Sequence, residues 1–259
     1  MLTRLLNGLV HRYKQLTFRP YVIQRHVCGD EIRFLIGDLF GEGWYGPHHD
    51  PWPELQWIKD HGIQRGDVVI DCGANHGFST VLFSKWTGVT GMVHAIEPTQ
   101  HNLEILGANL RLNNISNAVV HPVAAGESNG PIRVTDHPNA SVTNDPSMKA
   151  VPVEMRRLDD EIDDSQVNFI KIDVEGYELQ VLEGASRILQ TRPRLALELH
   201  INMYREPVRV IEQIFEKLSS LGYSMFVQTK VDGPICSFDD QRHSRVHLAE
   251  CEIVHLFCL

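Results

Sequence analysis

The heptapeptide DCGANHG, residues 71–77, is the strongest indication of the fold because it joins two segments of different periodicity. Residues 67–72 form an apolar run that ends in an acid, which is typical of a buried parallel strand. Residues 77–86 carry apolar side chains at helical spacing. A glycine-rich turn between such a strand and a helix indicates an α/β sheet that binds ligands at the carboxyl ends of its strands.

Strand-like and helix-like segments alternate through most of the remaining chain. Further parallel strands are predicted for four apolar runs, at residues 91–98, 118–125, 168–174 and 194–200. Helices are predicted over 179–189 and 207–221, and the apolar segments 223–228 and 251–259 are predicted to pair antiparallel. We therefore expect an α/β fold: a Rossmann-like, doubly wound, mostly parallel seven-stranded sheet with a terminal antiparallel strand.

Two regions fall outside this alternation. Residues 126–166 contain clusters of turn-forming residues and two short alternating runs, which predict an inserted hairpin with a loop around 137–145. Residues 1–66 are mixed and rich in turns. We expect an N-terminal helix and cap segment over 1–66 and the main α/β domain over 67–259.

Composition and charge exclude several classes of protein. The chain has 259 residues, of which 42% are hydrophobic and 22% charged, so it can bury a sizeable core and is not disordered. Its longest apolar runs are much shorter than the roughly 18 residues that span a bilayer. The net charge of −9 disfavours binding to phosphate backbones, so no nucleic-acid partner is expected.

The cysteines bear on the cellular compartment. There are five of them, an odd number, and their spacing fits neither a zinc site nor a redox pair. Free cysteines are typical of a reducing compartment, so a cytoplasmic location is predicted.

The first residues have helical spacing, with leucines and a tyrosine on one face. The first 29 residues also contain five basic residues and no acid. This pattern fits a weak contact with a membrane surface or a subunit, including a homo-oligomer. It equally fits a helix that packs on its own domain. The residues on this face are Leu2, Leu5, Leu6, Leu9, Tyr13 and Leu16.

The turn also contains residues suited to a nucleoside ligand. Gly73 and Gly77 permit a close approach of the backbone, and Glu97 ends the next strand, where an acid can accept ribose hydroxyls. Asn75 occupies the place of the second glycine in a dinucleotide fingerprint. Asp71, before the first glycine, would repel a pyrophosphate but attract the ammonium of a methionine moiety. The pattern therefore favours S-adenosylmethionine over NAD.

Three segments resemble the FkbM family of S-adenosylmethionine-dependent methyltransferases, within the class I superfamily. They are VVIDCGANHGFST (68–80), AIEPTQHNLEILGANLRLNN (95–114) and VNFIKIDVEGYELQVLEGA (167–185). The resemblance implies a methyltransferase domain, S-adenosylmethionine as cofactor, and O-methyl transfer to a hydroxyl of a carbohydrate or a glycosylated or natural-product metabolite. It implies cofactor contacts by Asp71, Gly73, Asn75, Gly77 and Glu97.

Tyr45 lies in the turn-rich segment GEGWYGP, residues 41–47, before the first motif. In a methyltransferase, the segment before this motif often covers the cofactor. Tyr45 is therefore a candidate cofactor contact, and a core or interface aromatic is the alternative.

Four polar residues are candidates for catalysis. Asp173 and Glu175 flank the end of one predicted strand, and Glu198 and His200 lie at the end of the next. Adjacent strands are about 5 Å apart, so these groups are expected to converge. His200 is the preferred general base because an unperturbed imidazole is largely neutral at pH 7. The carboxylates are alternative bases or acceptor-positioning groups, and a structural role is the alternative for His200.

Other functions compete with methyl transfer. The carboxylates could bind Mg²⁺, but the chain lacks metal-ligand motifs such as H-E-x-x-H, so no metal is predicted. A nicotinamide-dependent oxidoreductase on a similar sheet is one alternative, disfavoured by the missing middle glycine. A non-catalytic partner or membrane-surface protein that retains the fold is another.

Overall fold

The computed structural model describes residues 17–47, 53–163, 166–230, 233–239 and 243–259. The predicted N-terminal helix over 1–16, with the contacts expected of it, lies outside these residues. Across the described part of the chain, no helix is long and apolar enough to cross a membrane. All five cysteines are free.

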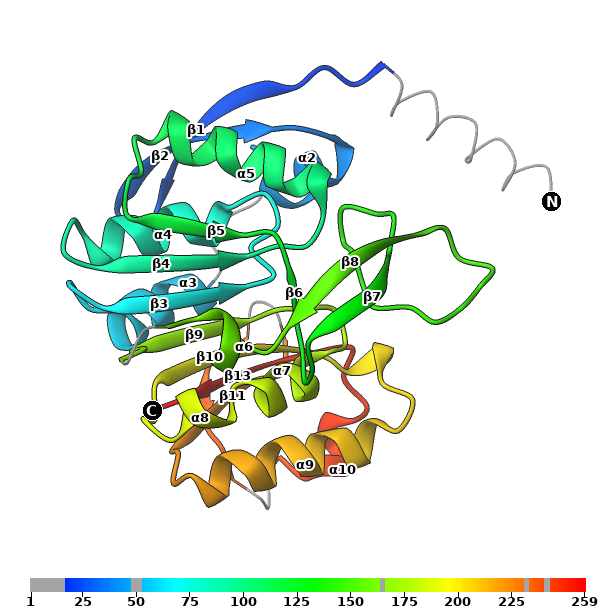
Figure 1. Ribbon diagram of the computed structural model, residues 1–259. Helices are drawn as coiled ribbons and strands as arrows, with labels where there is room; N and C mark the ends of the chain where they lie inside the picture. Colours follow the sequence, from blue (N-terminus) through cyan, green and yellow to red (C-terminus); the bar gives the residue numbers. More distant parts are fainter. Residues whose placement is uncertain (1–16, 48–52, 164–165, 231–232, 240–242) are drawn as a thin grey trace.

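An eight-stranded sheet forms the centre of the fold, in the order β12-β11-β13-β10-β9-β3-β4-β5 (Figure 1). β13 (Ile253–Cys258) runs antiparallel to both β10 and β11 (Met225–Gln228), as predicted for the terminal pair. The short β12 (Cys236–Ser237) pairs with β11, so the sheet has one strand more than the seven predicted. The parallel strands are β3 (Val68–Cys72), β4 (Met92–Ile96), β5 (Ala118–His121), β9 (Phe169–Ile172) and β10 (Arg194–His200).

Each face of the sheet has its own hydrophobic core, because neighbouring side chains of a strand point to opposite faces. On one face, Val69 and Phe169 pack with α3 (Pro53–Trp57), α4 (Phe78–Thr87) and α5 (Gln100–Leu112). On the other face, Ile70 and Ile170 pack with three later helices. They are α7 (Glu178–Gly184), α8 (Ser186–Leu189) and α9 (Pro207–Ser220).

The N-terminal segment is built onto the first of these cores. β1 (Tyr21–Val27) and β2 (Asp30–Ile36) form a hairpin beside α5 (Figure 1). Leu35 N donates to Asn109 Oδ1 at 2.6 Å, which joins β2 to that helix. The chain then forms α2 (Leu39–Tyr45), α3 and the π-helical turn η1 (Ile58–Gly62) before β3. The hairpin buries Val27, Ile32, Phe34 and Ile36 in the same cluster as the sheet.

The predicted inserted hairpin is confirmed and has a third strand. β7 (Gly130–Thr135) and β8 (Ala150–Arg156) pair antiparallel, and β6 (Ala124–Ala125) runs parallel to β8. The predicted strand over 118–125 is thus two strands in two sheets, separated at Pro122, which has no N–H to donate to a ladder. Figure 1 shows the β7–β8 hairpin projecting beyond the carboxyl ends of the parallel strands.

The predicted helix over 179–189 is interrupted at Ala185, between α7 and α8. Asp159 begins α8 by accepting hydrogen bonds from Arg187 N at 2.7 Å and Ile188 N at 3.0 Å. Asp159 lies in α6 (Leu158–Glu161), so a tertiary contact causes the break. The remaining short elements are η2 (Ile201–Met203) and α10 (Arg245–Leu248).

Candidate active site

A cavity of about 370 Å³ lies at the carboxyl ends of β3, β4, β9 and β10. It is lined by all four predicted catalytic residues, Asp173, Glu175, Glu198 and His200. Of the predicted cofactor residues, Gly73, Asn75, Glu97 and Tyr45 line it, whereas Asp71 and Gly77 do not.

The turn after β3 depends on its first glycine. Gly73 has φ +79°, and a Cβ at this position would lie 1.7 Å from the carbonyl oxygen of Asp173. No side chain fits in that space, so glycine lets the loops after β3 and β9 approach closely. Asn75 also has a positive φ of 49°, a conformation that asparagine adopts more readily than most residues.

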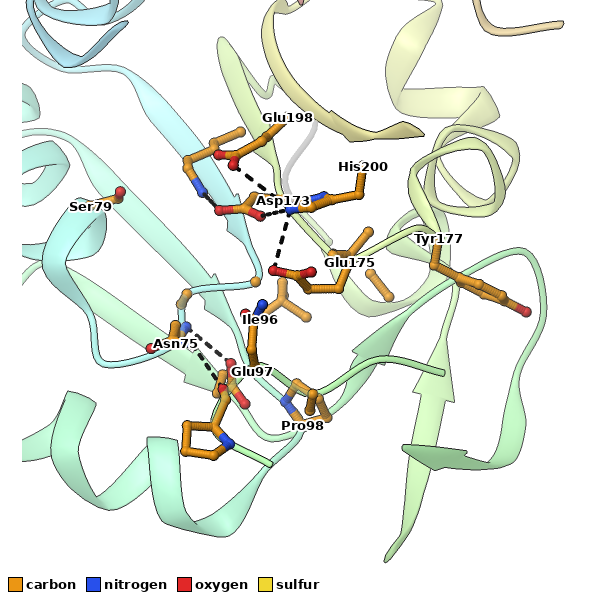
Figure 2. A pocket seen from close by; sticks show the side chains of 18 of the residues that line it. Asn75, Ser79, Ile96, Glu97, Pro98, Asp173, Glu175, Tyr177, Glu198 and His200 are labelled. Carbon is orange, nitrogen blue, oxygen red and sulfur yellow. Dashed lines mark hydrogen bonds and ion pairs between the residues drawn. The ribbon is translucent and has the colours of Figure 1, made fainter. Parts of the chain in front are cut away.

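Glu97 and Asn75 are joined at the edge of the cavity (Figure 2). Asn75 N donates to Glu97 Oε2 at 3.0 Å. The other oxygen, Oε1, accepts from Thr99 N, Thr99 Oγ1 and Asn102 Nδ2. A carboxylate oxygen can accept more than one hydrogen bond, so Oε2 retains capacity for a ligand hydroxyl. This geometry fits the ribose role predicted for Glu97.

The inserted hairpin closes over this side of the cavity. The carbonyl oxygen of Pro138 accepts from Asn75 Nδ2 at 3.0 Å and from Asn102 Nδ2 at 2.8 Å. Pro138, Asn139 and Ala140 all line the cavity. The loop between β7 and β8 is therefore bonded to the side of the cavity that Asn75 lines.

Asp71 and Gly77 do not line the cavity, unlike the other residues that were predicted to contact the cofactor. Asp71 is fully buried, and its Oδ2 accepts a hydrogen bond from Thr80 Oγ1 at 2.6 Å in α4. Burial raises the pKa of its carboxyl, and the cation of Lys171 opposes that shift. Gly77 begins α4 with φ +84°, and a Cβ there would lie 3.1 Å from Leu106 Cγ. Asp71 is bonded to the first turn of α4 through Thr80. Gly77 lets the start of α4 pack closely on Leu106 of α5.

The four predicted catalytic groups converge as expected (Figure 2). His200 Nε2 lies 3.3 Å from Glu175 Oε1, 3.7 Å from Glu198 Oε1 and 3.9 Å from Asp173 Oδ1. His200 Nδ1 lies 3.0 Å from Oε1 of Glu178, which is completely buried. The imidazole therefore lies among four carboxylates.

These carboxylates favour the charged form of His200 rather than the neutral form that was expected. Hydrogen bonds with Glu175 and Glu178 and the charge of Asp173 outweigh burial and raise the pKa of His200 to about 11. At neutral pH the ring is then an imidazolium, which has no free lone pair to accept a proton. The predicted convergence of these groups is confirmed, but His200 is not the base in this protonation state.

Comparisons with known proteins identify the family of the chain. Residues 71–225 match the family described as Methyltransferase FkbM domain. The chain belongs to the FkbM methyltransferase family. It is 27% identical over 181 residues to Methyltransferase 1 of Beauveria bassiana, covering 60% of this chain and 67% of that protein.

The chain is also similar to solved structures, and the first of the two below shows the same fold. One is an SAM-dependent O-methyltransferase from Thermotoga maritima, with a TM-score of 0.50 and 14% identity, covering 92% of this chain and 77% of that one. Another is an SAM-dependent methyltransferase from Aquifex aeolicus, with a TM-score of 0.45 and 16% identity, covering 80% of this chain and 89% of that one. The FkbM family assignment favours a methyltransferase over the nicotinamide-dependent alternative.

In this FkbM domain, a polar band crosses the sheet below the cavity. Asp71 and Lys171 are register partners on β3 and β9, and Glu198 and His255 are partners on β10 and β13. Lys171 Nζ donates to Asp173 Oδ2 at 2.8 Å. The charges of Asp173, Asp71 and Glu198 raise the pKa of Lys171 despite its burial, so this lysine is a fixed cation. It holds Asp173 at the strand end.

Sequence reasoning missed both Lys171 and Glu54. Lys171 interrupts the apolar run 168–174, and a charge inside a buried strand is a signal that was available. Glu54, from α3, lines the cavity, and its Oε2 is buried without a hydrogen-bond partner in the described structure. Burial is the main cause that raises the pKa of Glu54 to about 7. Nothing in the local sequence of α3 distinguishes this residue.

Tyr45 lines the cavity of the FkbM domain, and it is also a packing residue, so the predicted cofactor contact stays a prediction. Its ring stacks on Phe78 with centroids 5.1 Å apart and meets Phe34 edge-on at 5.2 Å. These contacts hold α2 against the core, so the ring presents one side to the cavity.

The cluster around His200 also bears on the prediction that no metal is used. One ligand atom each from Asp173, Glu175 and His200 lies within 4.8 Å of the other two. His200 also contacts Glu178 and Glu198, so these side chains already form a network of paired groups. The absence of a metal from the reaction stays a prediction.

Proposed function

We propose that this FkbM domain is an S-adenosylmethionine-dependent O-methyltransferase. Its acceptor is a hydroxyl of a carbohydrate or of a glycosylated or natural-product metabolite. One observation carries the proposal: a single cavity joins a nucleoside-binding edge, Asn75 and Glu97, to a cluster of carboxylates at Asp173 and Glu198.

The donor fits the β3–β4 half of this cavity. Glu97 Oε2 accepts a ribose hydroxyl, and the turn containing Gly73 and Asn75 passes along the same edge. When bound, S-adenosylmethionine supplies an activated methyl group on a positively charged sulfur. The carboxylate of Asp173 lies beside the turn and suits the cationic end of that molecule.

The acceptor fits the β10–β13 half. Glu54, Glu175 and Glu198 supply acceptors for the hydroxyls of a polyol, and Asn202 adds an amide. Phe40, Trp44 and Tyr45 line the cavity as well and offer apolar faces for the C–H groups of a sugar ring. The same carboxylates repel phosphate groups, which disfavours nucleic acid as the acceptor.

Glu54 is the best-placed group to take the hydroxyl proton. Its unpartnered Oε2 belongs to a residue that lines the cavity, and the charges that act on it come from His255, Glu198 and Lys171. Two of these residues lie on β10 and β13, away from the nucleoside-binding edge. In this role Glu54 accepts the proton as the acceptor oxygen becomes nucleophilic, while Lys171 and His200 keep the other carboxylates in place.

The test is incubation of the enzyme with methyl-labelled S-adenosylmethionine and a panel of sugars, glycosylated metabolites, small amines and RNA. We expect label on an oxygen of a hydroxylated acceptor, located by mass spectrometry and NMR. Label only on nitrogen or on nucleic acid would contradict the proposed acceptor class. Failure of S-adenosylhomocysteine to bind in calorimetry would contradict the proposed donor.

A further inference from the structure

A second group of ligating side chains lies apart from the carboxylate cluster. Asp38 precedes α2, His76 is in the turn after β3, and His101 is in the first turn of α5. None of these three residues lines the cavity. They come from segments far apart in sequence, so only the tertiary structure brings them together.

The three side chains converge on one carboxylate oxygen. Asp38 Oδ2 lies 2.6 Å from His101 Nε2 and 3.6 Å from His76 Nε2. One ligand atom from each residue lies within 4.8 Å of the other two. The second oxygen of Asp38 accepts from Gly41 N at 2.7 Å and caps α2, which orients Oδ2 toward the histidines.

An independent observation points to a ligand at this place. His76 is fully buried, and neither of its ring nitrogens has a hydrogen-bond partner within the described residues. Buried polar atoms are nearly always bonded, so an unpartnered imidazole needs an explanation. Phe40 and Tyr45 pack around the ring, with centroids 6.2 Å and 5.9 Å from it. Besides these rings, the polar groups next to the imidazole are the carboxylate of Asp38 and the amide of Asn102, and neither makes a well-formed hydrogen bond with it. An ion held by Asp38 would supply the bond that His76 Nε2 lacks.

We propose that Asp38, His76 and His101 bind a divalent transition-metal ion, with Zn²⁺ as the best match. Two imidazoles and one carboxylate form a borderline-soft donor set that suits Zn²⁺, Co²⁺ or Ni²⁺. Mg²⁺ and Ca²⁺ prefer oxygen ligands and match it poorly. His101 is about half exposed (53%), so water can complete a tetrahedral site and the ion has a path of entry.

A bound ion would connect the N-terminal segment, the turn after β3 and, through His101, the start of α5. Asp38 begins α2, which lines the cavity through Phe40 and Trp44. His76 directly follows Asn75, a residue of the nucleoside-binding edge. The ion thus joins the N-terminal segment to the turn after β3, and it acts from outside the reaction cavity.

The test measures the metal itself, independently of methyl transfer. The full chain is treated with a chelator, which is then removed, and Zn²⁺ binding is followed by calorimetry and Co²⁺ binding by its visible absorption. Wild type is expected to bind one equivalent of Zn²⁺ more tightly than each of two ligand variants, Asp38→Asn and His101→Ala. Loss of a residue that only supports a metal ligand lowers metal affinity by about 10–100-fold. Loss of a ligand itself should lower the Zn²⁺ affinity by at least that much. Asparagine still caps α2, so Asp38→Asn removes the ligand but keeps the helix start.

His26→Ala is the matched control, because His26 is an exposed histidine (74%) close to another carboxylate, Glu31. It should bind Zn²⁺ as wild type does. Equal affinity in wild type, Asp38→Asn and His101→Ala would overturn the site. So would loss of the ion in Glu175→Gln with retention in His101→Ala, because that places the ion at the carboxylate cluster. S-adenosylhomocysteine binding, measured separately, keeps this outcome distinct from failure of the proposed function.

Discussion

Glu178, the first residue of α7, is completely buried and contacts the last residue of β10, with its Oε1 3.0 Å from His200 Nδ1. The same oxygen accepts from Gly176 N at 2.9 Å, and Oε2 accepts from Tyr204 Oη at 2.6 Å. This buried carboxylate fixes the orientation of the imidazole. It is also one cause of the raised pKa of His200.

We expect His200 to remain protonated at neutral pH, with a pKa of about 11 in the folded protein and 6.5 as its ordinary value. A raised pKa stabilises the fold below pH 6.5, and this contribution falls progressively as the pH rises toward 11. Glu178→Gln should lower the pKa of His200, because one of its carboxylates loses its charge. NMR titration of the His200 ring measures both values. A wild-type ring that titrates near 6.5 would contradict this assignment.

Glu97→Ala should weaken binding of S-adenosylhomocysteine, because the ribose hydroxyls lose their acceptor. We expect a loss of about 1–3 kcal/mol, or about 5–150-fold in affinity. Calorimetry measures the change. Glu104→Ala is the control, since this acid lies in α5 and does not line the cavity. Unchanged affinity in Glu97→Ala would place the ribose elsewhere.

Glu54→Gln should bind S-adenosylhomocysteine normally but lose turnover by about 10²–10⁴-fold, the usual contribution of a general base. The base form of Glu54 is the carboxylate, so the wild-type rate should rise with pH and reach half its maximum near a pKa of about 7. The variant should lack this step. A variant with wild-type turnover and the same pH profile would show that Glu54 only packs.

Gly73→Ala should destabilise the protein through backbone strain and through steric overlap. The same substitution at Gly29 separates these two effects. Gly29 has φ +80° with open space around its Cβ position, so Gly29→Ala tests backbone strain alone, at about 1–2 kcal/mol. At Gly73 a Cβ also overlaps the carbonyl of Asp173, which adds about 1–3 kcal/mol. Urea unfolding compares the two variants. Equal losses would mean that the loops after β3 and β9 do not approach closely.

The sequence by itself determined the class of fold and predicted which strand ends carry the candidate site. The apolar run before DCGANHG and the helical spacing after it depend on local periodicity, which a single chain displays directly. Asp173 and His200 were found because strand ends in a parallel sheet share one edge. The break at Ala185 and the division of the strand at 118–125 were missed, because a distant cap and a second sheet cause them.

Only the tertiary structure decided the chemical state of the site. The side chains that change the protonation of His200 come from other segments, so its ordinary pKa was the only value the sequence offered. Asp71 was expected in the cavity, yet the hydrogen bond from Thr80 holds it underneath. Glu54 enters from a short helix before β3, and the pairing of Asp38 with His76 and His101 depends on how two loops and the start of α5 pack. Burial and mutual distance set these properties, and neither is a function of local sequence.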